Sequence, residues 1–226
     1  MSLFMADGTP IEVGVNELYG KRIMQIGDSN TNGGISGGGN EPSVGYHYAL
    51  SKKYGYTYIN NGDNGASWEL RDNDYDAKSG VTKVDALLAS GELPDILLIA
   101  LGTNGSSNGE ATDTRDNTHT IYGAVRYCLY ELKTKAPTLR VGVILPPNRG
   151  TTCGVIDEGQ ASRNEIIRSV CREYAVPCCD MLYESGITPD MLSDGLHLQN
   201  ADIIVERMPL PRWLYMRRLE SFLLTL

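Results

Sequence analysis

The sequence alternates short apolar runs with stretches of helical periodicity, and this alternation restricts the fold more than any other feature. Five runs have the composition of buried strands: Ile23–Ile26, Tyr56–Ile59, Ile96–Leu101, Val141–Leu145 and Val176–Cys179. Between these runs lie segments in which apolar residues recur every three to four positions. Strands that alternate with helices build a parallel sheet whose two faces are both covered. The pattern therefore predicts an α/β fold around a five-stranded parallel sheet.

Apolar stripes predict two of the covering helices. One stripe occupies Ile121–Leu132 and another Ile166–Tyr174, each shortly before a predicted strand. Pro137 and Pro177 follow these stripes and end the helices, because proline lacks the backbone N–H that a helix needs. The run Met208–Leu226 is expected to form a last helix that closes the sheet, and it is the candidate contact for a homodimer.

The length of 226 residues fits one α/β domain, predicted to span residues 21–226 after an N-terminal extension of residues 1–20. The formal net charge of -8 provides no basic surface for nucleic acid or anionic lipid, so neither is an expected partner. No apolar stretch approaches the roughly 20 residues that cross a bilayer, so membrane insertion is not expected. These properties favour a soluble enzyme that acts on a small molecule or a glycan.

Cysteine usage bears on the compartment and on metal binding. Five cysteines cannot all pair within one chain, and all except Cys153 lie in predicted helices or strands, where small core residues are expected. Unpaired cysteines favour the cytoplasm. Residues 1–10 lack the features of a signal peptide, but Met1–Leu3 resembles a remnant of cloning, so a removed secretion signal stays an alternative. The cysteines lack the paired spacing of zinc ligands, and no metal or other cofactor is expected.

Ser29, Asp194 and His197 together have the chemistry of a serine esterase. Ser29 comes three residues after a predicted strand, where a sharp turn can expose a hydroxyl. A serine hydroxyl is a weak nucleophile at neutral pH and needs a base, for which an imidazole with an ordinary pKa of about 6.5 is suited. Asp194 lies three residues before His197 in a glycine-containing turn, so it can accept a hydrogen bond from the ring. Each residue alone is common in turns and caps, and the combination carries the prediction.

Rival candidates lack this context. His47 lies in a helical pattern and His119 at a predicted helix start, and both are interpreted as structural residues because neither has an acid in a short glycine-containing turn. The segment Gly34–Gly38 matches the Gly-x-Ser-x-Gly pattern of another hydrolase fold, with Ser36 at its centre, but no strand directly precedes it. It also lacks the lysine of a phosphate-binding loop. A flexible rim beside Ser29 is the preferred interpretation of this segment.

Acyl transfer also needs hydrogen-bond donors for the oxyanion of the tetrahedral intermediate. The backbone N–H of Ser29 is one candidate, and the side-chain amide of Asn104, just past the third predicted strand, is another. A glycine N–H after the second strand is the third, from either Gly62 or Gly65. Asn104 also suits a simple turn beside its neighbouring glycines, an alternative that these residues leave open.

Three polar segments are expected to shape a substrate pocket beside these residues: Thr31–Pro42, Glu69–Asp76 and Pro146–Gly159. Asp28 and Asn30 flank the candidate nucleophile and, with Trp68, are the predicted substrate contacts. An aromatic face beside amide and carboxylate groups suits a sugar ring, which favours an acylated carbohydrate or another polar molecule as substrate. A position of Trp68 in the core is the alternative.

Taken together, the motifs resemble those of the SGNH hydrolases, also called GDSL esterases and lipases, a family named for four sequence blocks. The matching segments are Gly27-Asp28-Ser29 for the first block, Gly65 for the second, Gly102-Thr103-Asn104 for the third and Asp194-x-x-His197 for the last. Asn30 stands where the first block usually has Leu or Ile, and Gly105 stands where the third block often has Asp. Leu198-Gln199 replaces the Pro-Asn pair that often follows the histidine.

The resemblance implies a three-layer α/β/α sandwich of flavodoxin-like type, the SGNH hydrolase fold. It implies catalysis by Ser29, Asp194 and His197, and an oxyanion hole formed by Ser29, Gly65 and Asn104. The predicted function is hydrolysis of short acyl esters, above all O-acetyl esters of a carbohydrate or another polar molecule, through an acyl-enzyme. The alternatives are a lipase or lysophospholipase, a non-catalytic carbohydrate-binding or partner-binding domain on the same fold, and a nucleotide or flavin binder.

Overall fold

The computed structural model describes residues 16–36, 46–192, 194–200 and 210–226, so most of the N-terminal extension lies outside the described residues. A five-stranded sheet of order β3-β1-β4-β5-β6 forms its centre, and every neighbouring pair of strands is parallel. The strands are β1 (Arg22–Gly27), β3 (Thr57–Gly62), β4 (Ile96–Ala100), β5 (Arg140–Leu145) and β6 (Cys178–Asp180). The predicted fold class, an α/β sandwich around a five-stranded parallel sheet, is confirmed.

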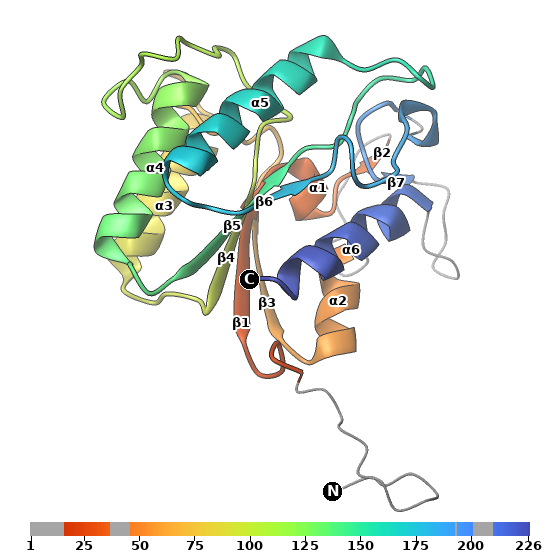
Figure 1. The fold of residues 1–226 in the computed structure, drawn as a ribbon, viewed down its shortest axis with the longest axis horizontal. Helices are drawn as coiled ribbons and strands as arrows, with labels where there is room; N and C mark the ends of the chain where they lie inside the picture. The colour runs from red at the N-terminus through yellow and green to blue at the C-terminus, as the bar shows by residue number, and fades with distance from the viewer. Residues whose placement is uncertain (1–15, 37–45, 193, 201–209) are drawn as a thin grey trace, which may run out of the picture.

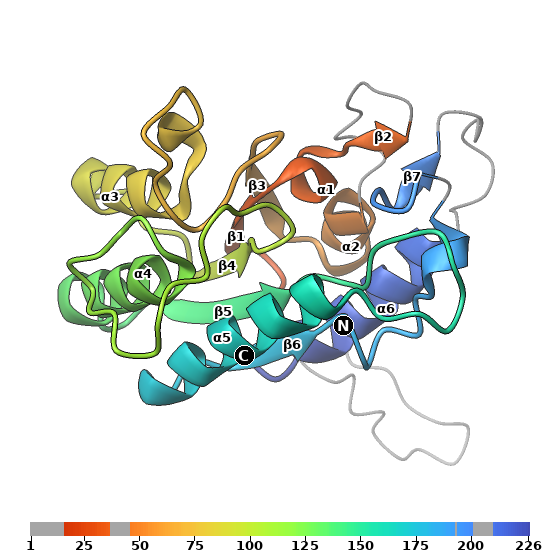
Figure 2. The same cartoon turned by 90° about the horizontal axis from the view of Figure 1, so that it is seen from above.

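Helices cover both faces of the sheet (Figures 1 and 2). On one face lie α3 (Gly80–Ser90), α4 (Ile121–Lys135) and α5 (Glu158–Glu173), and on the other lie α2 (Tyr46–Tyr54) and α6 (Leu210–Leu223). The fully buried strand β4 shows why both faces need cover. Side chains alternate along a strand, so Leu97 and Ile99 pack with one group of helices while Leu98 packs with the other.

The strand order changes direction at the centre of the sheet. From β1 the chain passes to the neighbour on one side, β3, and then returns past β1 to β4 on the other side. The connections that leave the carboxyl ends of β1 and β4 therefore diverge, and in open parallel sheets ligands bind at such a point. Ser29 follows β1 and Asn104 follows β4, so both lie where the connections diverge.

A second, two-stranded sheet joins segments from opposite ends of the sequence. Strand β2 (Ile35–Ser36) pairs in parallel with β7 (Gln199–Asn200), with Ile35 opposite Gln199. The short helix α1 (Ser29–Asn32) precedes β2, and His197 precedes β7 by two residues. The small sheet therefore holds the chain on either side of the predicted nucleophile and base close together (Figure 2).

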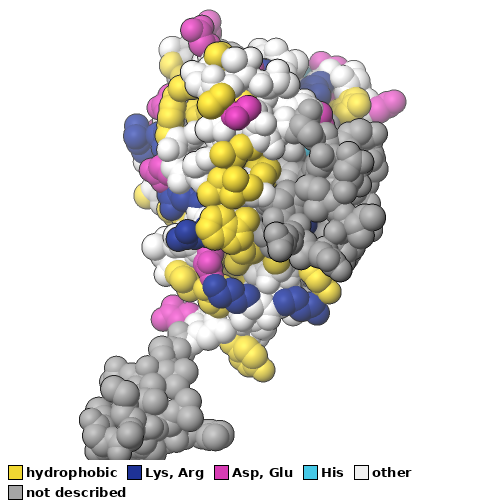
Figure 3. Space-filling view, turned by 90° about the vertical axis from the view of Figure 1, so that its right-hand side faces the viewer, with side chains coloured by type: hydrophobic (Ala, Val, Ile, Leu, Met, Phe, Trp, Pro, Cys, Tyr) yellow, Lys and Arg dark blue, Asp and Glu magenta, His cyan; other side chains and the backbone are white. Residues whose placement is uncertain are grey.

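The described residues at both ends of the chain pack on the same face of the sheet. Leu18, from the predicted extension, is buried there together with Leu219 and Phe222 of α6. Hydrophobic side chains also gather in a band on the surface where α2 and α6 lie, and Leu210 and Trp213 of α6 are exposed (Figure 3). The homodimer contact through this helix stays a prediction. Among the described residues, no helix combines the length and the apolar composition that a membrane span requires.

Two 3-10 turns complete the described secondary structure. They are η2 (Asp76–Lys78), which ends the loop after β3, and η3 (Pro189–Met191), which lies a few residues before Asp194. Loops rather than long elements therefore carry most of the polar residues at the carboxyl edge of the sheet, as expected for a site built on a rigid α/β frame.

Candidate functional site

Ser29 lies in a tight turn between β1 and α1. Asp28 is the N-cap of α1, and its carboxylate accepts a hydrogen bond of 3.0 Å from the Asn30 N–H. Gly27 permits this turn because a Cβ atom there would lie 2.0 Å from Oγ1 of Thr31. Ser29 is the first residue of the helix and is 8% exposed, so its hydroxyl is held at the end of a buried strand.

His197 hydrogen-bonds both predicted partners at once. Its Nε2 lies 3.0 Å from Oγ of Ser29, and its Nδ1 lies 2.6 Å from Oδ2 of Asp194. The second carboxylate oxygen, Oδ1, accepts the backbone N–H groups of Leu196 (3.0 Å) and His197 (2.8 Å). The carboxylate therefore fixes the turn and the ring together. With the proton on Nδ1 bound to Asp194, Nε2 is left as an acceptor that faces the serine hydroxyl.

The charge state of Asp194 follows from these contacts. Partial burial raises the pKa of its carboxyl, but the hydrogen bonds from the His197 side chain and from the backbone outweigh that effect. The net result is a pKa below the ordinary value. Asp194 is therefore a carboxylate at neutral pH, as a partner for an imidazolium requires.

Asn30 holds the chain on both sides of His197, and its role as a substrate contact stays a prediction. Its side chain is buried, its Nδ2 donates to the carbonyl of Leu196 (3.3 Å), and its Oδ1 accepts from the N–H of Leu198 (3.1 Å). Both ends of the amide are thus used within the protein. A Leu or Ile at position 30 could make neither hydrogen bond.

Asp28 is almost fully buried beside Ser29, and its role as a substrate contact stays a prediction. It is 2% exposed, and its carboxylate accepts the Asn30 N–H at 3.0 Å. Burial raises the pKa of this carboxyl, against the opposing effect of hydrogen bonds and of nearby His197. Asp28 therefore holds the turn that carries Ser29.

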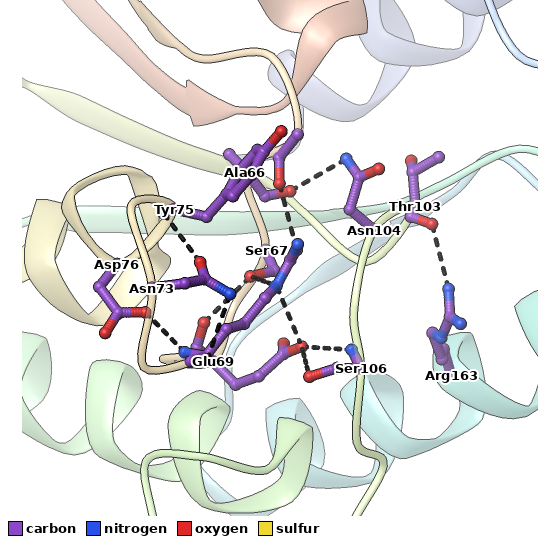
Figure 4. Close-up of polar contacts among 12 residues, drawn as sticks. Ala66, Ser67, Glu69, Asn73, Tyr75, Asp76, Thr103, Asn104, Ser106 and Arg163 are labelled. Atoms are coloured by element: carbon purple, nitrogen blue, oxygen red, sulfur yellow. Dashed lines mark hydrogen bonds and ion pairs between the residues drawn. The ribbon is translucent and has the colours of Figure 1, made fainter.

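Two of the three predicted oxyanion donors, Gly65 and Asn104, lie on neighbouring loops, and Figure 4 shows Asn104 beside Ala66 of the other loop. Nδ2 of Asn104 donates to the carbonyl of Ala66 at 3.1 Å, which uses one of its two amide hydrogens and ties the loop after β4 to the loop after β3. The choice between Gly62 and Gly65 has a geometric basis. The Gly62 N–H is already bound to Oδ1 of Asn60 at 2.9 Å, whereas the Gly65 N–H makes no hydrogen bond within the described part of the chain. Gly65 is the better candidate for the third donor.

Trp68 belongs to the core, so its prediction as a substrate contact is wrong. The side chain is fully buried, and its Nε1 donates to the carbonyl of Leu101 at 3.0 Å. The aromatic ring that does border the site is that of Tyr75, which is 43% exposed. A Cβ atom on Gly65 would lie 2.4 Å from Cε1 of Tyr75, so this ring lies directly against the candidate donor.

The remaining histidines lie apart from this site. His47 is buried, its ring stacks on Tyr58, and its Nδ1 lies 3.0 Å from the hydroxyl of Tyr56. Burial lowers its pKa to about 3, so the ring is neutral at physiological pH. His119 is exposed and lies 3.0 Å from Asp72.

The cysteines and the second serine candidate, Ser36, were the remaining residues to place. Cys128, Cys171 and Cys179 are buried, and Cys153 is exposed. Within the described residues, no three His, Cys, Asp or Glu side chains are grouped so that they could hold a metal ion. Ser36 lies in β2, and its side chain is outside the described part of the structure.

Two functional features were missed by reasoning from sequence. The first is the role of Asn30, for which the unusual polar residue after Ser29 was the available signal. The second is the pair Glu69 and Arg71, which contacts the loops of both predicted oxyanion donors. A single arginine within an acidic loop was a weak signal for that pair.

Comparison with known proteins identifies the family of this chain. The profile of the GDSL-like Lipase/Acylhydrolase family matches residues 26–201, which include all of the predicted site residues. No curated protein matches the chain at a significant level.

Several solved structures share the fold. A protein from Lactobacillus plantarum has a TM-score of 0.70 and 22% identity, with 92% of this chain and 99% of that chain covered. A carbohydrate acetylesterase from Sinorhizobium meliloti has a TM-score of 0.62 and 20% identity, with 91% and 99% covered. An aryl esterase from M. smegmatis has a TM-score of 0.64 and 20% identity, with 91% and 100% covered. At these identities the likeness concerns the fold.

Proposed function

Because the chain belongs to the GDSL-like Lipase/Acylhydrolase family and is a carboxylic ester hydrolase of that family, we propose that it cleaves short acyl esters of polar molecules with Ser29 as nucleophile. The observation that carries this proposal is the continuous hydrogen-bond chain from Ser29 Oγ through the His197 ring to Asp194. A nucleophile, a base and a group that orients the base is the arrangement that serine acyl transfer needs.

The geometry supports a double-displacement mechanism. Oγ of Ser29 attacks the ester carbonyl while Nε2 of His197 takes the hydroxyl proton, and Asp194 stabilises the imidazolium that forms. When the tetrahedral intermediate collapses, His197 returns the proton to the leaving alcohol and the acyl group stays on Ser29. Water, activated by the same ring, then attacks the acyl-enzyme and releases the carboxylic acid.

The oxyanion is proposed to accept hydrogen bonds from the Ser29 N–H, the Gly65 N–H and the free amide hydrogen of Asn104. The Gly65 N–H and one hydrogen of Asn104 make no hydrogen bond within the described residues, so both are available to a ligand. Donors fixed in advance cost no reorganisation during the reaction, and each is typically worth about 10²- to 10³-fold in rate.

Polar groups around the site support an acylated polar substrate, with O-acetyl esters of a carbohydrate as the preferred class. Asn32 and Asn64 are hydrogen-bonded to each other at 3.3 Å at the surface, between the Ser29 and Gly65 segments. The half-exposed ring of Tyr75 takes over the role first assigned to Trp68, because an aromatic face suits a sugar ring. One of the fold neighbours is a carbohydrate acetylesterase, in line with this proposal.

The proposal is tested by chain-length preference and by labelling of the nucleophile. We expect p-nitrophenyl acetate and acetylated sugars to be hydrolysed faster than p-nitrophenyl decanoate. A fluorophosphonate should add its mass to Ser29, and Ser29→Ala should abolish both labelling and turnover, whereas Ser36→Ala should retain both. A strong preference for decanoate would favour a lipase instead, and a folded protein that neither labels nor hydrolyses esters would favour a binding domain.

A further inference from the structure

A buried ion pair connects the two loops that carry the predicted oxyanion donors. Glu69 is fully buried, and its Oε1 lies 3.8 Å from Nε of Arg71. Its second oxygen, Oε2, has no hydrogen-bond partner among the described residues. Burying a carboxylate with one oxygen unsatisfied costs free energy. This cost points to a role for Glu69 at its position.

Arg71 fixes the loop that contains Gly65. Its guanidinium donates to the carbonyl of Gly65 (3.1 Å) and to Oγ of Ser67 (2.9 Å). Gly65 has a φ of +77°, a left-handed conformation. Because glycine has no Cβ atom, its backbone can leave this conformation easily unless other groups hold it. The planar guanidinium reaches both acceptors at once, which a single ammonium group does less well.

Glu69 fixes the segment that follows Asn104. Its Oε1 accepts the backbone N–H of Ser106 at 2.7 Å (Figure 4). The carboxylate lies directly against Gly105, where a Cβ atom would be 3.2 Å from Oε1. On the other side of Asn104, the carbonyl of Thr103 accepts from Arg163 at 3.0 Å, so the backbone is held both before and after the amide.

We infer that Arg71 and Glu69 are positioning residues that set the distance between the Gly65 N–H and the Asn104 amide across the oxyanion hole. The two loops meet at the Asn104–Ala66 hydrogen bond. Arg71 hydrogen-bonds the loop of Gly65, and Glu69 hydrogen-bonds the loop of Asn104. The inference rests on the proposed function, because it assigns a role within the same reaction. Neither side chain touches the substrate in this role.

The test uses two changes at the pair. Arg71→Lys keeps the charge but loses the bridge between Gly65 and Ser67. The double variant Glu69→Gln/Arg71→Met removes both charges, so it leaves no unpaired buried carboxylate and keeps the test informative if a single loss of Arg71 prevents folding. The matched control is the pair of Arg168 on α5 and Asp180 at the end of β6, which lie 2.5 Å apart and belong to neither of the two loops. Their side chains are 18% and 6% exposed, close to the 17% and 0% of Arg71 and Glu69.

We expect Arg71→Lys to lower kcat for p-nitrophenyl acetate about 10-fold and the double variant about 10²-fold, both with KM within about two-fold of wild type. In an Asn104→Ala background the loss from the double variant should shrink by at least about three-fold, because one of the donors that it positions is already gone. Arg168→Lys and Asp180→Asn/Arg168→Met should keep wild-type kcat.

Four outcomes would overturn the inference. Unchanged kcat in both variants of the pair would show that the donors hold their places without it. An undiminished loss in the Asn104→Ala background, or an equal loss in the Arg168 variants, would mean a general effect on the fold, which thermal unfolding would register. A wild-type protein without esterase activity or Ser29 labelling would overturn the proposed function together with the inference, whereas the first three outcomes, in an active wild type, leave the proposed function standing.

Discussion

The two halves of the candidate site are built in different ways. In the acid–base half, with Ser29, Asp194 and His197, the chain on both sides of His197 is held by neutral contacts, namely the Asn30 amide and the β2–β7 pairing. The carboxylates of Asp28 and Asp194 accept backbone N–H groups in the two turns of this half. The half that carries Gly65 and Asn104 is held by a buried charge pair. The first half also has the more exposed side chains, 30% for Asp194 and 19% for His197, whereas Glu69 has no exposed surface.

This difference teaches which changes each half should tolerate. A neutral hydrogen bond contributes about 0.5–1.5 kcal/mol net, so losing one in the acid–base half should weaken the reaction in small steps. Removing one partner of a buried ion pair leaves an uncompensated charge, which typically costs about 3–5 kcal/mol. Single changes in the acid–base half should therefore alter rates in a folded enzyme, and single changes behind the oxyanion donors should affect folding as well.

The largest expected effect within this comparison comes from Asp194→Asn. An amide at this position presents an N–H to the ring or favours the wrong tautomer, so Nε2 no longer faces Ser29 as a base. We expect kcat/KM for p-nitrophenyl acetate to fall by about 10⁴-fold. Thermal unfolding should show the variant folded. A loss of less than about 10-fold would mean that Asp194 does not orient the base.

Asn104→Ala removes one proposed donor from the other half. We expect kcat to fall by about 10²- to 10³-fold with little change in KM, since the donor acts on the oxyanion that develops in the transition state. Asn16→Ala, which removes an exposed amide that bonds to the carbonyl of Tyr54 before the amino ends of β1 and β3, is the control and should retain near wild-type kcat. A KM effect without a kcat effect would place Asn104 in ground-state binding instead.

Asn30→Leu tests whether the neutral clamp matters for the acid–base half. It deletes both hydrogen bonds that flank His197, together worth roughly 1–3 kcal/mol, so we expect a loss of about 10-fold in kcat/KM. Asn30→Asp keeps the acceptor for the Leu198 N–H but loses the donor to Leu196 and should give an intermediate rate. Equal rates for wild type and Asn30→Leu would show that the β2–β7 pairing suffices to hold the base.

The smallest expected effect on activity comes from changing His47, which lies outside both halves. The pKa of His47 is lowered to about 3 by burial, so between the unfolded value of about 6.5 and that value the unfolded chain alone takes up a proton. The contribution of His47 to the free energy of unfolding is therefore fully present above about pH 6.5. On acidification below that pH this contribution falls by about 1.4 kcal/mol per pH unit. His47→Gln should remove that part of the slope in urea unfolding between pH 6 and 4, while kcat changes by less than about two-fold.

The sequence predicted what depends on local pattern and failed where distant residues decide. The five strands followed from apolar runs, and the Asp194–His197 turn followed from its spacing. The role of Asn30 could not be predicted because its partners lie 166 and 168 residues away. Trp68 next to a polar loop suits either a pocket or the core, and its hydrogen bond to Leu101, 33 residues away, decides for the core.

The same limit applies to the ion pair of Glu69 and Arg71. An acidic loop with one arginine gives no indication of which backbone groups these side chains reach. The partner of Glu69 is the N–H of Ser106, 37 residues further along the chain, and it can be identified when the packing of two loops is known. The catalytic roles assigned to the site residues stay predictions until the variants are measured.

The pairing of β2 with β7 has a consequence for biosynthesis. The hydroxyl and the ring that bonds it are separated by 168 residues, and the small sheet that brings them together cannot form before residues 199–200 exist. Until residues 194–200 have been synthesised, neither His197 nor strand β7 can meet the segment of Ser29. The proposed nucleophile and its proposed base therefore come together only after residues 29–193 have been made.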